Sequence, residues 1–123
     1  MQLGMIGLGR MGANIVRRLM RTGHTCVVYD RDPAAGQALA AEGAQAVASL
    51  ADFVSKLTPP RAVWVMLPAG GPTETTIQTL RGLLTKGDVV IDGGNSFWRD
   101  DIRRGAELAA DGLHYLDVGT SGG

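Results

Sequence analysis

The 123 residues are enough for one domain with its own core. Apolar residues make up 45% and charged residues 20%, and 12 basic side chains balance 12 acidic ones, with no basic stripe that would indicate nucleic acid or a membrane surface. The N-terminus does not resemble a signal peptide, and no segment approaches the ~20 apolar residues that cross a bilayer. The single Cys26 lies in an apolar run, where we expect a buried, inert thiol. These features predict a cytoplasmic protein.

In chain order, the sequence predicts six strands that alternate with five helices. Continuous apolar and β-branched runs predict strands over 2–6, 25–29, 44–47, 62–67, 89–92 and 113–118. Apolar residues at helical spacing predict helices over 10–22, 33–42, 50–58, 73–85 and 97–111. Asp32 and Ser49 are the expected N-caps of the second and third helices. On the first helix, Met11, Ile15, Val16 and Leu19 lie on one face.

This alternation predicts an α/β fold with a doubly wound, parallel sheet of the Rossmann type. Right-handed crossovers give the strand order 3-2-1-4-5-6. A ligand then belongs at the carboxyl ends of the strands, where strands one and four part. Glycine-rich loops follow strands one, four, five and six. We therefore expect these loops to lie along one edge of the sheet.

The loop after the first strand reads Gly7-Leu8-Gly9-Arg10-Met11-Gly12, a G-x-G-x-x-G pattern between a strand and a helix. In this setting Gly7 permits the tight turn, Gly9 leaves room for a pyrophosphate, and Gly12 lets the helix pack closely on the sheet. N–H groups at the helix start would face the phosphate anion. The pattern alone is a weak signal, but its position predicts dinucleotide binding.

Asp30 ends the second strand, where its carboxylate can accept hydrogen bonds from the adenosine ribose. A 2′-phosphate at ~4 Å would be repelled by about 4 kcal/mol at an effective dielectric of ~20, an upper figure. Asp30 therefore favours NAD over NADP. Arg31 leaves NADP open because an arginine can hold a phosphate instead. A further alternative is that Asp30 only caps the loop before Pro33.

Four stretches that occur in order along the chain carry a resemblance to a known family. They are Gly7-Leu8-Gly9-Arg10-Met11-Gly12, Val65-Met66-Leu67-Pro68-Ala69-Gly70, Ile91-Asp92-Gly93-Gly94-Asn95-Ser96 and Asp117-Val118-Gly119-Thr120-Ser121-Gly122-Gly123. Together they resemble the cofactor domain of 6-phosphogluconate dehydrogenase, the decarboxylating enzyme of the β-hydroxyacid dehydrogenase superfamily. The Asp-Gly-Gly-Asn-Ser stretch points to the phosphogluconate branch, since the 3-hydroxyisobutyrate branch usually has Ser-Thr there.

The resemblance implies that NAD(P) accepts hydride from 6-phosphogluconate, which is then decarboxylated to ribulose 5-phosphate. By position, Asn95 would contact both nicotinamide and substrate. The residues that would hold the substrate are Ser121, Gly122 and Gly123. Met11 and the loop formed by Leu67, Pro68 and Ala69 would border the cofactor. From local pattern alone, Asn95 and Ser96 could instead turn the chain and cap the fifth helix.

The family's general-base lysine and acid glutamate lie in a following helical domain, whereas this chain ends at Gly123. We therefore expect residues 1–123 to be a truncated dinucleotide-binding domain that binds cofactor without useful turnover, and the full-length protein to be a homodimer or larger. No metal site is assigned, and Lys56 and Lys86 sit at helix ends as solvated cations. Two alternatives remain: another β-hydroxyacid dehydrogenase, of the 3-hydroxyisobutyrate type, and a nucleotide-sensing module without chemistry.

The remaining large or charged side chains are interpreted as structural. Trp64 lies in the middle of the fourth strand and is expected in the core. His24 and His114 lie next to strand ends without an evident partner. Arg103 and Arg104 are interpreted as a solvated face of the fifth helix.

Overall fold

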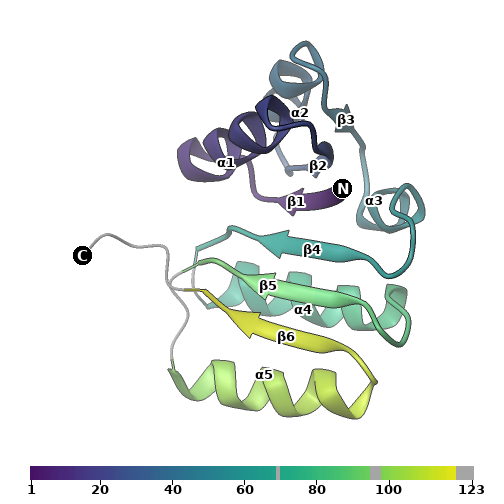
Figure 1. Cartoon of the computed structure of the whole chain (residues 1–123). Coiled ribbons are helices and arrows are strands. Elements are labelled where there is room, and N and C mark those ends of the chain that lie inside the picture. Colours follow the sequence, from purple (N-terminus) through teal and green to yellow (C-terminus); the bar gives the residue numbers. More distant parts are fainter. Residues whose placement is uncertain (69, 95–97, 119–123) are drawn as a thin grey trace.

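The computed structural model describes residues 1–68, 70–94 and 98–118. Within these residues a parallel sheet of six strands has the predicted order β3-β2-β1-β4-β5-β6 (Figure 1). The two halves of the sheet meet where β1 pairs with β4, through Gly4, Met5 and Ile6 opposite Val63, Trp64 and Val65. The strands are β1 (Gln2–Ile6), β2 (Thr25–Tyr29), β3 (Gln45–Ala46), β4 (Ala62–Val65), β5 (Val89–Asp92) and β6 (His114–Asp117).

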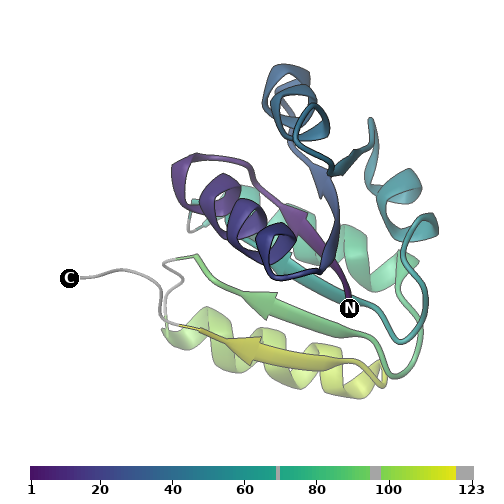
Figure 2. The ribbon, with the colours of Figure 1, turned by 45° about the horizontal axis from the view of Figure 1, so that its top comes forward.

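Five helices cover the two faces of this sheet. They are α1 (Arg10–Arg21), α2 (Pro33–Ala40), α3 (Leu50–Ser55), α4 (Gly71–Leu83) and α5 (Trp98–Ala110). Figure 2 shows α1 and α5 on opposite sides of the sheet. This arrangement follows from right-handed crossovers that run in opposite directions away from β1, and it confirms the doubly wound Rossmann architecture.

Each face of the sheet has its own hydrophobic core. On one face, Phe53, Ile77 and Leu108 from α3, α4 and α5 pack against the sheet residues Val63 and Val65. On the other face, the core of α1 and α2 side chains includes Val16 and Leu39, and packs on Met5, Cys26 and Val28. Trp64 is partly buried against this second core, and Cys26 is 4% exposed, which confirms the prediction of a buried thiol.

The capping predictions for two helices are confirmed. Asp32 accepts a hydrogen bond from the Ala34 amide at 3.1 Å, and Ser49 accepts one from the Asp52 amide at 3.1 Å. Among the described residues, no helix has both the length and the apolar content needed to span a bilayer.

Several predicted element ends were wrong. β3 has only two residues, both exposed, because it is an edge strand with little to bury. β4 stops at Val65, two residues earlier than expected, and α4 begins at Gly71 rather than at residue 73. A proline in the first turn is compatible with this start, since Pro72 needs no N–H partner there. Met66 and Leu67 therefore belong to the loop after β4, and this loop and the first turn of α4 lie at the edge of the sheet.

Candidate functional site: a cleft where strands β1 and β4 part

A cavity of about 580 Å³ opens at the carboxyl edge of the sheet, beside the ends of β1 and β4. Six of the residues predicted to bind cofactor line it, namely Gly7, Gly9, Asp30, Arg31, Leu67 and Pro68. The structure therefore brings together residues from the loops after three different strands. This is the place where a doubly wound sheet receives its ligand.

The glycine turn after β1 has the geometry that the sequence predicted. Gly7 has a φ of +95°, and a Cβ added there would collide with the carbonyl oxygen of Met66. A Cβ at Gly12 would collide with the carbonyl oxygen of Gly7, so α1 could not begin so close to β1 with any larger residue. Gly9 differs, because a Cβ there would meet no atom within 4 Å. The space beside Gly9 belongs to the cavity and is available to a ligand.

The first turn of α1 lies directly beside that space. Gly9 is its N-cap and supplies no side-chain hydrogen bond to the turn. The N–H groups of a first helical turn have no partner within the helix, and they carry the positive end of the helix dipole. An anion placed next to Gly9 would therefore meet several backbone donors.

Asp30 connects two loops at the cleft. Its Oδ2 accepts a hydrogen bond from the Leu8 amide at 2.7 Å, and its Oδ1 accepts one from the Asp32 amide at 2.8 Å. The carboxylate thus holds the glycine turn against the start of α2. Each carboxylate oxygen has a second lone pair, so the group retains acceptor capacity for a ligand hydroxyl. The Leu8 contact was not predicted, because no local pattern shows which amide a side chain 22 positions away will meet.

The opposite wall of the cleft is formed by the loop after β4 and the first turns of α4. Thr73 is fully buried, and its hydroxyl donates to the Pro68 carbonyl at 2.8 Å, which fixes this loop on α4. Thr75 and Thr76 line the cavity, as do Tyr29 and Met66, and none of these four was predicted. The sequence could have indicated Thr75 and Thr76, since polar residues in the first turns of the helix after strand four lie at the edge of the sheet where a ligand is expected.

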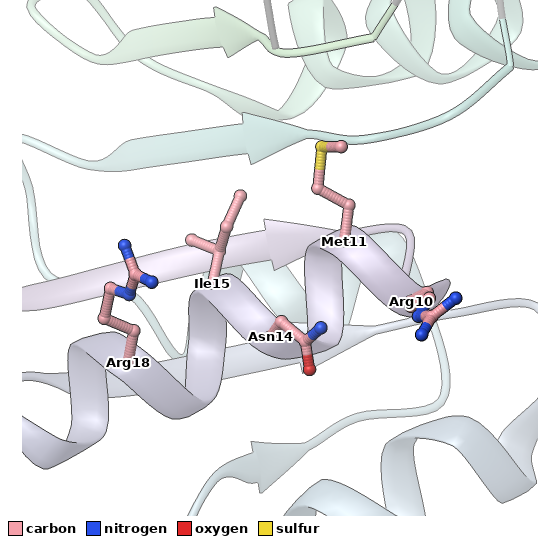
Figure 3. A pocket seen from close by; sticks show the side chains of 5 residues that line it. All are labelled: Arg10, Met11, Asn14, Ile15 and Arg18. Atoms are coloured by element: carbon pink, nitrogen blue, oxygen red, sulfur yellow. The ribbon is translucent and has the colours of Figure 1, made fainter. Parts of the chain in front are cut away.

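The three larger residues of the glycine motif do not line this cavity. Leu8 is 6% exposed, so its side chain belongs to the core and only its amide reaches the site. Arg10 and Met11 line a second cavity of about 420 Å³ along α1, together with Asn14, Ile15 and Arg18 (Figure 3). Met11 is 45% exposed, so it does not share the burial of Val16 on the same predicted face. It lies in the first turn of α1, one turn before the partly buried Ile15.

The predicted residues Ala69, Asn95, Ser121, Gly122 and Gly123 lie outside the described residues. The glycines before Asn95 are described and show that the loops after β4 and β5 meet. A Cβ added at Gly94 would lie 2.5 Å from the carbonyl oxygen of Leu67. The expected convergence at one edge is therefore confirmed for the loops after β1, β4 and β5.

The interpretation of Arg103 and Arg104 as a solvated face was wrong for Arg104. Its side chain is 1% exposed, and its Nε donates to Glu74 Oε1 on α4 at 2.9 Å. The Arg103 side chain is 45% exposed and binds the same carboxylate. A hydrogen bond from Arg103, with another from Arg104, lowers the pKa of Glu74 to about 2, although burial alone would raise it. The burial arises because α4 and α5 lie side by side on the sheet.

The chain resembles known proteins over nearly its whole length. Residues 2–123 match the family model described as the NAD binding domain of 6-phosphogluconate dehydrogenase. A relative from Haloferax volcanii, named an NAD(+)-dependent, decarboxylating 6-phosphogluconate dehydrogenase, is 44% identical over 100% of this chain and 40% of its own. Curated relatives are longer, and this chain spans 27% to 41% of their length.

Solved structures give the same architecture. A 6-phosphogluconate dehydrogenase from Plasmodium falciparum superposes with a TM-score of 0.91 at 26% identity, over 100% of this chain and 28% of its own. A 3-hydroxyisobutyrate dehydrogenase from Mycobacterium tuberculosis superposes with a TM-score of 0.87 at 27% identity, over 99% of this chain and 41% of its own. Both neighbours are dehydrogenases of greater length. On the family match and the sequence identities, this chain belongs to the NAD-binding domains of the 6-phosphogluconate dehydrogenase family.

Proposed function

We propose that residues 1–123 bind NAD in the cleft between β1 and β4, as the cofactor domain of an enzyme that oxidises and decarboxylates 6-phosphogluconate. The observation that carries this proposal is the meeting of the Gly7–Gly12 turn and the Asp30 carboxylate in one cavity of about 580 Å³. Backbone donors suit a pyrophosphate, and a carboxylate suits the hydroxyls of a ribose.

In this proposal each part of the dinucleotide is assigned its own residues. The pyrophosphate would lie against Gly9, which lines the cavity and has open space where a Cβ would stand, and would accept from the N–H groups at the start of α1. The adenosine ribose would lie at Asp30, and Arg31 would border the adenosine. The nicotinamide would lie toward Leu67 and Pro68, and Ala69 and Asn95 are the other residues proposed to contact it. Leu8, Arg10, Met11 and Gly12 would complete the glycine turn at the pyrophosphate.

NAD is the preferred cofactor in this proposal. Asp30 uses both carboxylate oxygens to hold amides, so its charge is fixed at the place where a 2′-phosphate would enter. The relative from Haloferax volcanii is named NAD(+)-dependent, which supports the same preference. The Plasmodium falciparum enzyme was solved in complex with NADP+ as its cofactor, so members of the fold differ in this choice.

The proposed substrate is 6-phosphogluconate, held by Asn95, Ser121, Gly122 and Gly123. When bound, NAD supplies the acceptor for the hydride from the substrate. The part of this chain is to hold and orient both molecules, and the proton-transferring lysine and glutamate are expected in a following domain. The structural likeness to a 3-hydroxyisobutyrate dehydrogenase favours that acid as the second candidate. Kinetics of the full-length protein separate the two, since 6-phosphogluconate should be oxidised and 3-hydroxyisobutyrate should not.

Replacement of Gly9 by alanine tests the cofactor site. Gly9 has a φ of −65°, which any residue adopts, and a Cβ there meets no protein atom within 4 Å. The variant should therefore unfold at nearly the wild-type temperature, while its new methyl group occupies the space assigned to the pyrophosphate. In isothermal titration calorimetry we expect the affinity for NAD to fall at least tenfold.

The matched control is Gly82→Ala, near the end of α4. A Cβ at Gly82 also meets nothing within 4 Å, and Gly82 lies outside the cleft, so NAD affinity should stay within twofold of wild type. Unchanged affinity in Gly9→Ala would contradict the placement of the pyrophosphate. Absence of NAD binding by the wild-type chain would contradict the proposed function itself.

A further inference from the structure

A polar network lies behind the loop that follows β5, and its centre is Asp92. This residue ends β5 and is fully buried. Its Oδ1 accepts a hydrogen bond from the Gly94 amide at 3.0 Å, and its Oδ2 accepts one from the Tyr115 hydroxyl at 3.0 Å. The carboxylate therefore holds the turn after its own strand from within, and is itself held by the neighbouring strand β6.

Tyr115 joins Asp92 to α5. Its hydroxyl oxygen lies 2.8 Å from Asp101 Oδ1 as well as 3.0 Å from Asp92 Oδ2. A phenol has one proton, so it can donate to only one of two ionised carboxylates at a time. Burial raises the pKa of Asp101, the hydrogen bond from Tyr115 opposes this shift, and Asp117 and Asp92 raise the pKa further. The Tyr115 hydroxyl therefore bridges the two carboxylates and ties Asp101 on α5 to Asp92 at the end of β5.

Arg104 supplies the positive charge of this network. Its Nη1 lies 3.7 Å from Asp92 Oδ2 and 3.8 Å from Asp101 Oδ1, and its Nε binds Glu74 on α4. Carboxylate oxygens of Asp92, Asp101 and Asp117 lie within 4.8 Å of one another. Because the Arg104 guanidinium lies beside two of these carboxylates, the arrangement is explained by an ion-pair network and needs no metal ion.

The turn held by Asp92 packs against residues that line the cleft. A Cβ added at Gly93 would collide with Trp64 and Met66, and one at Gly94 would lie 2.5 Å from the Leu67 carbonyl oxygen. Met66 and Leu67 line the cleft on the side assigned to the nicotinamide. A shift of the Gly93–Gly94 turn would therefore move that wall, and would redirect the chain just before Asn95.

We propose that Asp92, Tyr115 and Arg104 are positioning residues for the nicotinamide end of the cofactor. They act through the Gly93–Gly94 turn, which they hold against the Leu67 wall of the cleft. This inference rests on the proposed function. The adenosine end is held by other contacts, those of Asp30 with the turn after β1. Damage to the network should therefore weaken the nicotinamide contacts and leave the adenosine contacts intact.

The variant Tyr115→Phe tests this separation, because it removes one hydroxyl and keeps the ring. The ligands are NADH and ADP-ribose, which has the same adenosine and pyrophosphate but no nicotinamide. We expect the affinity for NADH to fall about tenfold, equivalent to about 1.4 kcal/mol, the size of one buried hydrogen bond. The affinity for ADP-ribose should stay within twofold. The fluorescence of bound NADH should also approach that of free NADH.

The control variant is Asp111→Asn, which breaks the ion pair of Asp111 with Arg81 beyond the end of α5. It loosens the same pair of helices without touching Asp92, so it should leave the affinities for both ligands unchanged. Equal losses for NADH and ADP-ribose in Tyr115→Phe, or no loss for either, would overturn the inference. Equal affinity of the wild-type chain for the two ligands would overturn it as well. Absence of binding of both by the wild-type chain would refute the proposed function and this inference with it.

Discussion

Replacing Asp30 with asparagine removes one negative charge from the cleft and leaves the size of the side chain nearly unchanged. The wild-type carboxylate accepts one amide hydrogen bond on each oxygen, at 2.7 Å from Leu8 and 2.8 Å from Asp32. The asparagine side chain has only one acceptor oxygen, so its NH₂ group must face the other N–H donor. One hydrogen bond to a charged group is lost, which should cost about 2 kcal/mol of the free energy of unfolding. In a domain of this size the melting temperature should fall by roughly 8 °C.

The same change should alter cofactor choice. A 2′-phosphate about 4 Å from the Asp30 carboxylate would be repelled by at most about 4 kcal/mol at an effective dielectric of about 20. Removal of the charge should therefore raise the ratio of NADP to NAD affinity by at least tenfold, and by no more than about a thousandfold. Loss of stability and gain in NADP affinity arise from one carboxylate, but they are measured separately.

The assay is calorimetric titration of both nucleotides, with thermal unfolding of the free chain beside it. Asp32→Asn is the matched control, since Asp32 also carries a carboxylate near the site and caps α2, where asparagine is an equally good N-cap. That variant should change neither the melting temperature nor the affinity ratio appreciably. If Asp30→Asn lowered the melting temperature but left the ratio unchanged, Asp30 would serve only to hold the two loops.

Asp88 should make the free energy of unfolding depend on acid pH. Burial would raise the pKa of Asp88, but hydrogen bonds from the Arg61 and Thr85 amides and from the Arg61 guanidinium outweigh burial and lower it. The carboxylate therefore stabilises the fold above its unfolded pKa of about 3.9, and this stabilisation is lost as pH falls through the folded pKa. Asp88→Asn should therefore cost about 3 kcal/mol in urea unfolding at pH 7 and less at pH 3, and equal costs would contradict this account. Burial raises the pKa of Cys26, so a thiol reagent should modify it only after unfolding in urea, and fast labelling of the folded chain would show that β2 is accessible.

The sequence predicted best what depends on local rules. Strand order follows from alternating elements and crossover handedness, and the N-caps at Asp32 and Ser49 follow from residue type and position. Gly7 and Gly12 were assigned correctly because a left-handed turn and a close helix approach both exclude a side chain. The caps and the glycine turn need only a few neighbouring residues to be specified, and the strand order needs only the sequence of elements.

The contacts that the sequence did not predict depend on where the fold places their partners. Arg104 looks like an ordinary surface arginine until Glu74, 30 positions earlier, is placed beside it by the packing of α4 on α5. The Thr73 hydroxyl was not assigned either, since its acceptor is a loop carbonyl whose direction depends on where β4 ends. Neither contact leaves a periodic pattern in the sequence, because each depends on how the folded chain places the acceptor beside the donor.

The cleft lies across the seam between the two halves of the sheet, which are paired there only through β1 and β4. One wall comes from Gly7, Gly9 and Asp30 of the first half, and the other from Leu67 and Thr76 of the second. A molecule bound between them contacts both walls, so it binds only the state in which both halves are folded and joined. At a concentration a hundred times its dissociation constant it would stabilise that state by about 2.7 kcal/mol. Supply of the ligand would then govern how long the polypeptide withstands heat or proteases.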